Sequence, residues 1–276
     1  MRIGQFEVVT LSDGTFALDG GQMFGVVPKT LWEKKLAADA RNRVRLGLTS
    51  ALVLAGRHRI LIETGIGNKL DAKHSDIYGI ERSTTLIEAL GEHGLTPADI
   101  DMVINTHLHF DHCGWNTRRD GSRTVPTFPR ATYFIQRGEW EHAGQPNERD
   151  RGSYLEEFFM SAESQTELLE GNAEIIPGIR VEVFPGHTRH LQGVWIESEG
   201  ERALFISDLV PTRAHLPYPW IMSFDLYPME TLATKKRLLP ELARQRVRVI
   251  FPHDPGLSWS RVAERNGRIE AVPEAP

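Results

Sequence analysis

The chain has 276 residues, 40% of them hydrophobic, which is enough to bury a large core in one α/β domain or in two halves. Its formal net charge of -5 at pH 7, with scattered Lys and Arg, disfavours binding to nucleic acid. We expect a cytoplasmic protein without membrane contact, because there is no apolar segment of signal-peptide or membrane-span length and Cys113 is the single cysteine.

Apolar segments bounded by turn residues predict strands and helices that alternate along the chain. The strands are expected at residues 6–11, 51–56, 59–65, 101–107, 131–136, 180–184, 193–198, 203–208 and 247–253. The helices are expected at residues 28–43, 83–94 (with Ser83 as N-cap), 138–144, 154–170 and 229–246. This order predicts two mixed sheets with helices on their outer faces. We expect a single domain, 1–276, of two αβ halves that meet near residue 175.

The segment THLHFDHCGW, residues 106–115, is unusually rich in histidine. His107 and His109 are expected on one side of an extended strand, because strand side chains alternate with a period of two. If the chain then turns into a helix, its first turn directs Asp111 and His112 toward the same point. Converging imidazole and carboxylate groups predict a site for one or two divalent metal ions rather than a polar loop.

Three further strand ends carry residues of the same kind. His187 follows the strand at 180–184, Asp208 ends the strand at 203–208, and His253 ends the strand at 247–253. Each residue alone is typical of a hydrogen-bonded turn, but their recurrence in this order favours a shared site.

Together, the motifs LIETG, THLHFDH, PGHT, ISD and PHD resemble those of the metallo-β-lactamase-fold hydrolases over nearly the whole chain. The stretches MFGVVPKTLWEKK, DLVPTRAHLPYPWIMSFDLYP and IFPHDP are most similar to the quorum-quenching N-acyl homoserine lactonase branch. The resemblance implies a metallo-β-lactamase-like αββα sandwich. It also implies a metal-dependent lactonase whose small-molecule substrate is an N-acyl homoserine lactone.

The resemblance implies a ligand set for two divalent ions. It assigns His107, His109 and His187 to one ion, Asp111, His112 and His253 to the other, and Asp208 to a bridge between them. These donors suit zinc, with cobalt, iron or manganese as neighbours. A bound cation makes hydroxide available near neutral pH, so ester hydrolysis needs no serine or cysteine nucleophile. Asp111 is implied also to manage the proton of the leaving ring oxygen.

Glu63 departs from the family pattern, which usually has an aspartate at this place in LIETG to orient a ligand histidine. Glutamate keeps the charge and adds one methylene, so we expect the hydrogen bond to shift rather than vanish. The alternative is that Glu63 is a solvated strand-end residue.

Large apolar residues near the motifs predict the walls of a substrate pocket. The glycine-flanked loop contains Met23, Phe24, Val26 and Val27, and Asp208 is followed by Tyr218, Trp220, Met222 and Phe224. We expect these side chains, foremost Met23, Phe24, Tyr218 and Trp220, to bind an acyl chain, and His215 to reach the substrate. The same apolar residues would serve equally as ordinary core or as the contact of a homodimer.

The same pair of ions suits other hydrolytic reactions. Hydrolysis of phosphotriesters such as organophosphates, or of other lactones and esters, is therefore the alternative function.

Overall fold

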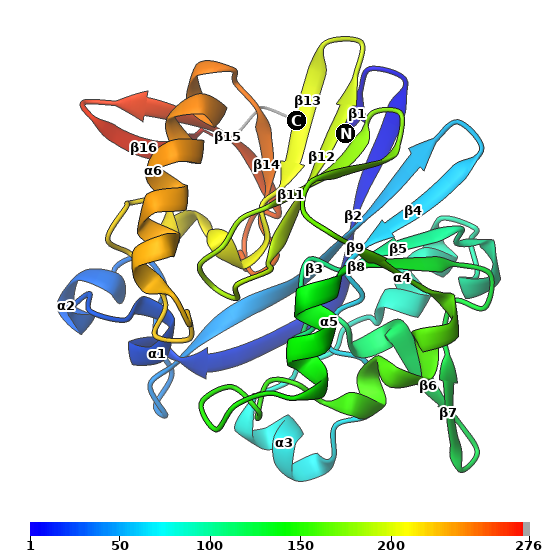
Figure 1. Cartoon of the computed structure of the whole chain (residues 1–276). Helices are drawn as coiled ribbons and strands as arrows, with labels where there is room; N and C mark the ends of the chain where they lie inside the picture. The colour runs from blue at the N-terminus through cyan, green and yellow to red at the C-terminus, as the bar shows by residue number, and fades with distance from the viewer. Residues whose placement is uncertain (273–276) are drawn as a thin grey trace.

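The computed structural model describes residues 1–272, and it consists of two seven-stranded β-sheets packed face to face with helices on the outer faces (Figure 1). The predicted αββα sandwich is confirmed. Residues 273–276 of the predicted domain lie outside the described residues. None of the helices within residues 1–272 is both long enough and apolar enough to cross a lipid bilayer.

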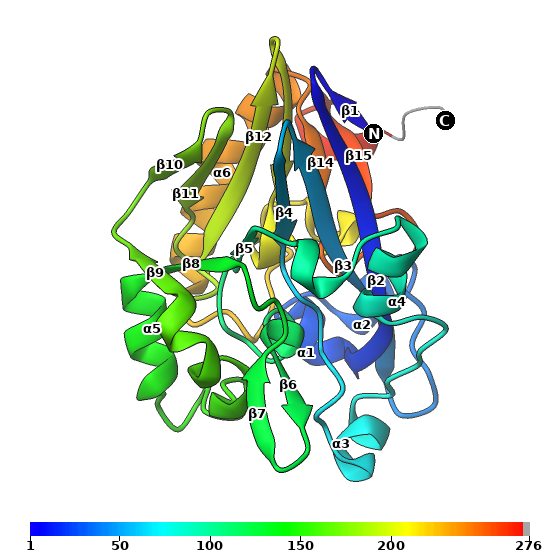
Figure 2. The ribbon, with the colours of Figure 1, turned by 90° about the vertical axis from the view of Figure 1, so that its right-hand side faces the viewer.

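The first sheet is built from the N-terminal part of the chain. Its strands are, in spatial order, β1 (Arg2–Ile3), β2 (Phe6–Asp19), β3 (Arg43–Ala55), β4 (His58–Ile62), β5 (Met102–Ile104), β8 (Thr132–Gln136) and β9 (Thr166–Leu169). A separate hairpin, β6 (Thr117–Asp120) and β7 (Arg123–Pro126), projects with α3 (Ala72–Ile77) at the end of the molecule opposite the β12–β13 turn (Figure 2).

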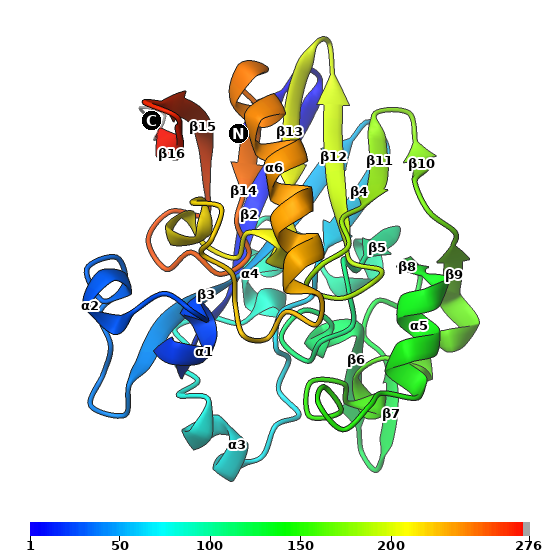
Figure 3. The ribbon, with the colours of Figure 1, turned by 60° about the vertical axis from the view of Figure 1, so that its left-hand side comes forward.

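The second sheet follows directly in the chain. Its strands are β10 (Ala173–Ile176), β11 (Ile179–Val183), β12 (Gln192–Ser198), β13 (Glu201–Phe205), β14 (Arg248–Ile250), β15 (Trp259–Arg265) and β16 (Arg268–Val272). The other helices are α1 (Gly20–Phe24), α2 (Lys29–Trp32), α4 (Leu86–Glu92), α5 (Arg137–Gly144) and α6 (Pro228–Arg244). Helix α6 covers the outer face of the second sheet (Figure 3).

The core lies in layers that follow the alternation of side chains along the strands. Ile60 and Ile62 of β4 belong to the cluster between the sheets, whereas Leu61 packs on the outer face with Leu90 of α4. The cluster between the sheets also contains Phe205 of the second sheet. Because both sheets share this core, we propose that the two halves form one domain.

Three predicted helical features are wrong in the structure. The helix expected at 28–43 ends after one turn, α2, and the segment at 154–170 forms two short 3-10 turns followed by strand β9. Helix α4 begins two residues later than expected. Its N-cap is Thr85, not Ser83, and Thr85 forms a capping box with Glu88.

Strands β2 and β3 form a ribbon that is longer than the sequence predicts, and the ribbon carries α1 toward one edge of the sandwich (Figure 1). The pairing shifts register between Ser12 and Thr15, and Asp13 lies buried at this irregularity. The Asp13 carboxylate accepts hydrogen bonds from the backbone of Ile66, Gly67 and Leu86 and from the indole of Trp115. Asp13 thereby fixes the loop that follows β4.

Candidate active site

Glu63 and three of the candidate ligands lie just beyond the ends of four strands at one edge of the sandwich. β4 and β5 are parallel, as are β13 and β14, so the carboxyl ends within each pair meet at the same edge. Glu63 follows β4, His107 follows β5, Asp208 follows β13 and His253 follows β14. The residues predicted at strand ends therefore lie close together in the fold.

The local geometry of the histidine motif differs from the prediction. Strand β5 ends at Ile104, so His107 and His109 lie in the following loop rather than on an extended strand, and no α-helix starts at Asp111. Backbone hydrogen bonds hold the loop instead: the His112 carbonyl accepts from Thr64 at 2.8 Å. The ligands converge because the loop is anchored to the chain beyond β4, not because of strand alternation.

His107, His109 and His187 form the first ligand group. Each of them offers a ring nitrogen, and these nitrogens lie within 4.8 Å of one another. His109 Nδ1 and His187 Nε2 are 3.0 Å apart. His107 Nε2 is buried and has no hydrogen-bonding partner.

Asp111, His112 and His253 form the second group. His112 Nε2 and His253 Nε2 are 3.0 Å apart, and Asp111 Oδ2 lies 3.7 Å from the first nitrogen and 3.6 Å from the second. Ring nitrogens this close repel each other unless a proton or a cation lies between them. The arrangement fits a divalent ion with imidazole and carboxylate ligands.

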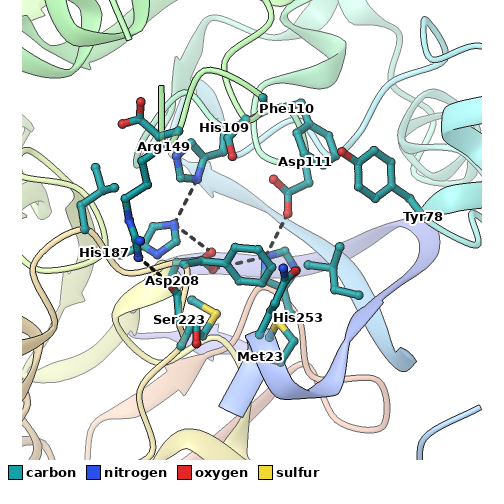
Figure 4. Close-up of a pocket in the computed structure, with 18 residues that line it drawn as sticks. Met23, Tyr78, His109, Phe110, Asp111, Arg149, His187, Asp208, Ser223 and His253 are labelled. Carbon is teal, nitrogen blue, oxygen red and sulfur yellow. Dashed lines mark hydrogen bonds and ion pairs between the residues drawn. The ribbon is translucent and has the colours of Figure 1, made fainter. Parts of the chain in front are cut away.

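Asp208 lies between the two groups (Figure 4). Its Oδ2 atom is 3.4 Å from His187 Nε2 and 3.5 Å from His112 Nε2, and its Oδ1 atom is 3.2 Å from His253 Nε2. One carboxylate thus faces histidines of both groups, as a ligand shared by two ions would.

Hydrogen bonds behind the histidines set which ring nitrogen is free. His187 Nδ1 lies 3.0 Å from Asp225 Oδ1, and His253 Nδ1 lies 2.9 Å from the carbonyl of Gly47. Each acceptor favours a proton on Nδ1, which leaves Nε2 as the metal-binding atom. Thr231 donates to the other oxygen of Asp225 at 2.6 Å and so holds that carboxylate in place.

Glu63 lies behind His112, with Oε2 3.4 Å from His112 Nδ1, and Oε1 accepts a hydrogen bond from the backbone of Thr106 at 2.8 Å. It is 1% exposed, so the alternative of a solvated strand-end residue is wrong. Its backbone has φ 65, a conformation that is uncommon for a residue other than glycine and occurs at functional sites.

The charges in the cluster are strongly coupled. Burial and the neighbouring rings lower the pKa of His107 and His109 well below the usual value. Burial opposes charge on His112 as well, but the carboxylates of Asp208 and Asp111 raise its pKa well above the usual value. Burial likewise opposes charge on Asp208, yet His253 and His112 hold its pKa well below the usual value. The site therefore combines neutral imidazoles at His107 and His109 with an ionised Asp208 carboxylate, whereas His112 must lose a proton when a metal ion binds.

The ligands lie at the base of a pocket of about 440 Å³ (Figure 4). Apolar and polar side chains share its walls. The apolar ones are Leu18, Met23, Tyr78, Phe110, Met222, Phe224 and Leu226, and the polar ones include Gln22, Arg149, Ser153 and Ser223.

Of the predicted wall residues, Met23, Met222 and Phe224 line this pocket, and Val26 and Val27 do not. Phe24 is fully buried and stacks on Trp32 at 5.3 Å and on His215 at 4.7 Å between ring centroids. Tyr218 and Trp220 line a different surface groove. The prediction was wrong for Phe24, Tyr218 and Trp220, because Phe24 packs into the core and the chain at Tyr218 and Trp220 lies beside α2, away from the ligands.

His215 does not reach the pocket either. Its Nδ1 atom is 2.8 Å from the Thr212 hydroxyl and its Nε2 atom is 2.8 Å from the carbonyl of Met23, so both ring nitrogens already have partners. Burial lowers its pKa to about 4. The expectation that His215 contacts substrate is wrong. It supports the segment that carries Met23.

No motif predicted Glu139, a buried carboxylate that connects three parts of the site. It accepts hydrogen bonds from the backbone of Leu108 at 3.1 Å, the Tyr154 hydroxyl at 2.9 Å and the Thr188 hydroxyl at 2.7 Å. Leu108 and Thr188 are direct neighbours of His109 and His187. Asp225, Tyr78 and Arg149 were missed as well, because an isolated charged or phenolic residue in a loop has no distinguishing pattern.

The chain has the four-layer αββα fold, and a histidine-rich cluster of candidate metal ligands lies at the ends of its strands. Together, these two features define a class of metal-binding proteins. The chain belongs to the metallo-beta-lactamase superfamily, whose family model matches residues 44–253. A probable metal-dependent hydrolase from Staphylococcus aureus has the same fold throughout, with a TM-score of 0.93, 32% identity, and coverage of 99% of this chain and 98% of that one.

Other relatives carry more specific names. An N-acyl homoserine lactonase from Bacillus thuringiensis is 27% identical over 174 residues, which is 61% of this chain and 62% of that protein. The match thus spans less than two thirds of that relative. The fold is also similar to that of AidC, described as a dizinc quorum-quenching lactonase, with a TM-score of 0.82, 21% identity, and coverage of 100% of this chain and 96% of the other.

Proposed function

We propose that the chain is a metal-dependent hydrolase that opens the lactone ring of N-acyl homoserine lactones, and so acts in quorum quenching. The observation that carries the proposal is Asp208, which faces both ligand groups at the base of a largely apolar pocket. The names of the relatives support the choice of substrate.

In this proposal His107, His109 and His187 hold one divalent ion, Asp111, His112 and His253 hold the other, and Asp208 contacts both. Zinc suits these donors best, with cobalt, manganese or iron as alternatives. When bound, such ions activate water at neutral pH and polarise a carbonyl oxygen.

The protein's own residues would position the substrate and move its proton. Asp111 lines the pocket and keeps one carboxylate oxygen near the ligands, so its other oxygen would be available to take up the proton that the attacking water loses and to pass it to the leaving ring oxygen. The apolar walls around Met23, Phe110 and Phe224 would exclude water and hold the acyl chain.

The test is ring opening by zinc-loaded protein, followed as proton release in weak buffer. The substrates are short- and long-chain N-acyl homoserine lactones, a simple lactone and an aryl phosphotriester. We expect turnover of the homoserine lactones well above that of the phosphotriester, and its loss in His109→Ala. His93→Ala, a change of an exposed histidine outside the site, is the matched control.

Turnover of the phosphotriester alone would favour the alternative function on the same residues, and turnover of the simple lactone alone would remove the signalling substrate. Full activity after removal of divalent ions by a chelator would refute the mechanism.

A further inference from the structure

We infer that Arg149 determines substrate specificity by binding an oxygen acceptor of the substrate away from the ester bond that is cleaved, namely the amide oxygen of an acylamino lactone. The inference rests on the proposed function and specifies which feature of the lactone the pocket recognises. Arg149 lines the pocket on the side of His187, across from Tyr78 and Phe110 (Figure 4).

The loop that carries Arg149 is held by hydrogen bonds around the buried Asp150. Asp150 is 5% exposed, its Oδ2 atom lies 2.6 Å from Nε2 of His142 in α5, and its Oδ1 atom accepts from the backbone of Asn147 at 3.0 Å. Asn147 in turn accepts from the backbone of Arg149 at 2.8 Å. The start of the Arg149 side chain is therefore held at the pocket wall.

The guanidinium contacts a second loop of the pocket wall, the one that contains Ser223. Arg149 Nη2 donates to the carbonyl of Ser223 at 2.6 Å. That loop is tied to the site because Leu226 donates to the carbonyl of His187 at 3.0 Å. Arginine has five N–H donors in a planar fork, so this single bond leaves most of them available.

Arg149 has no carboxylate partner among residues 1–272. Two acids adjoin Arg149 in the chain: Asp150 is paired with His142, and Glu148 forms no ion pair with Arg149 among residues 1–272. A substrate that fills the pocket removes water from the guanidinium, and this is unfavourable unless the substrate supplies an acceptor. A lactone with an acylamino group supplies one, whereas an alkyl lactone of equal length leaves the cation unpaired.

The discrimination should be large enough to measure. A hydrogen bond to a charged group typically contributes about 10- to 100-fold in affinity. A site built to bind a polar group also rejects analogues that lack it more strongly than an apolar site rejects a change of size.

The experiment compares zinc-loaded wild-type protein with Arg149→Gln and Arg149→Lys. For each protein, kcat and KM are measured with an N-acyl homoserine lactone and with a γ-alkyl lactone of the same chain length. Binding of the ring-opened N-acyl homoserine is measured separately by calorimetry. The control is Arg151→Gln, which removes the same charge from an exposed residue that does not line the pocket.

In Arg149→Gln we expect the ratio of kcat/KM for the acylamino lactone to that for the alkyl lactone to fall by about 10- to 100-fold, mainly through KM, with a matching loss in product affinity. In Arg149→Lys this ratio should fall less than in Arg149→Gln, because lysine keeps the positive charge but lacks the planar set of N–H donors of arginine. Arg151→Gln should leave the ratio unchanged.

An unchanged ratio and product affinity in Arg149→Gln, with lactone turnover intact in the wild type, would overturn the role of Arg149 alone. A wild-type protein that neither opens lactones nor binds the product would overturn both the proposed function and this inference.

Discussion

Two ligand histidines, His187 and His253, have their free nitrogen set by residues that lie outside every ligand motif. Asp225 lies 38 positions after His187 in the sequence, and Gly47 lies 206 positions before His253. The ligands themselves could be predicted from their types and from the strand ends they follow. Their supports could not, because only the fold brings such distant residues together.

Glu63 provides a first prediction at this scale. Glu63→Gln keeps the size of the side chain but removes the charge beside His112, so we expect zinc affinity to fall by about 10- to 100-fold. Affinity is measured by competition with a chromophoric chelator. Glu63→Asp, which restores the residue usual in the family, is the comparison and should lose less. Equal zinc affinity in Glu63→Gln and wild type would show that the carboxylate does not support the site.

His215 provides a second prediction, on the dependence of stability on pH. Its pKa is about 4 in the folded protein and about 6.5 in the unfolded chain. Between these values the unfolded state binds more protons, so the free energy of unfolding decreases as pH falls through this range. In His215→Gln this loss should be smaller than in wild type by about 2 kcal/mol between pH 7 and pH 5.

Urea unfolding of both proteins at the two pH values measures the effect of His215. Other histidines titrate in the same range, so the difference between the two proteins is the quantity to compare. Parallel loss of stability in wild type and variant would contradict the prediction.

At the scale of elements, local propensity failed where a turn or a strand partner competes with a helix. In the segment 28–43 only α2 is helical, and at its far end the Asp39 carboxylate accepts from the backbone of Arg41 and Arg43, which builds a turn before β3 in place of helix. The segment 154–170 ends as strand β9 because it pairs in parallel with β8. Helices α5 and α6, where no such competitor exists in the described chain, were predicted almost to their ends.

The start of α4 can be tested directly. Thr85 accepts from the backbone of Glu88, and Glu88 accepts from the backbone of Thr85, so Thr85→Ala should lower the free energy of unfolding by about 1 kcal/mol. Ser83→Ala should change it by less than about 0.5 kcal/mol, since Ser83 is exposed and outside the box. Chemical denaturation of the two variants measures the difference. A larger effect at Ser83 would restore the N-cap predicted from sequence.

At the scale of the whole molecule, the αββα sandwich followed from the alternation of strands and helices and from the resemblance to a known family. The path of the chain after Asp208 did not follow, because apolar residues near a site look the same in sequence whether they line a pocket or fill a core. Phe24, Tyr218 and Trp220 were misassigned for this reason.

The ligands come from both sheets, so bound ions should stabilise the entire sandwich. Zinc at 1,000 times its Kd would add about 4 kcal/mol to the free energy of unfolding. We expect EDTA to lower the Tm at pH 7.5, and to lower it much less at pH 5.5, where protons compete for the histidines. His109→Ala should lose most of the EDTA effect and His93→Ala should retain it. An identical Tm with and without EDTA at pH 7.5 would contradict ion binding.

The walls of the pocket come from separate loops, each attached to a different part of the scaffold. Met23 is carried by the β2–β3 ribbon, Tyr78 follows α3, Arg149 follows α5, and Phe224 precedes α6. A change in the composition of one loop need not disturb the ligand cluster, whose residues lie on other segments of the chain. In evolution, a lineage with this architecture can therefore alter the molecules it accepts one loop at a time while it inherits the reaction chemistry unchanged.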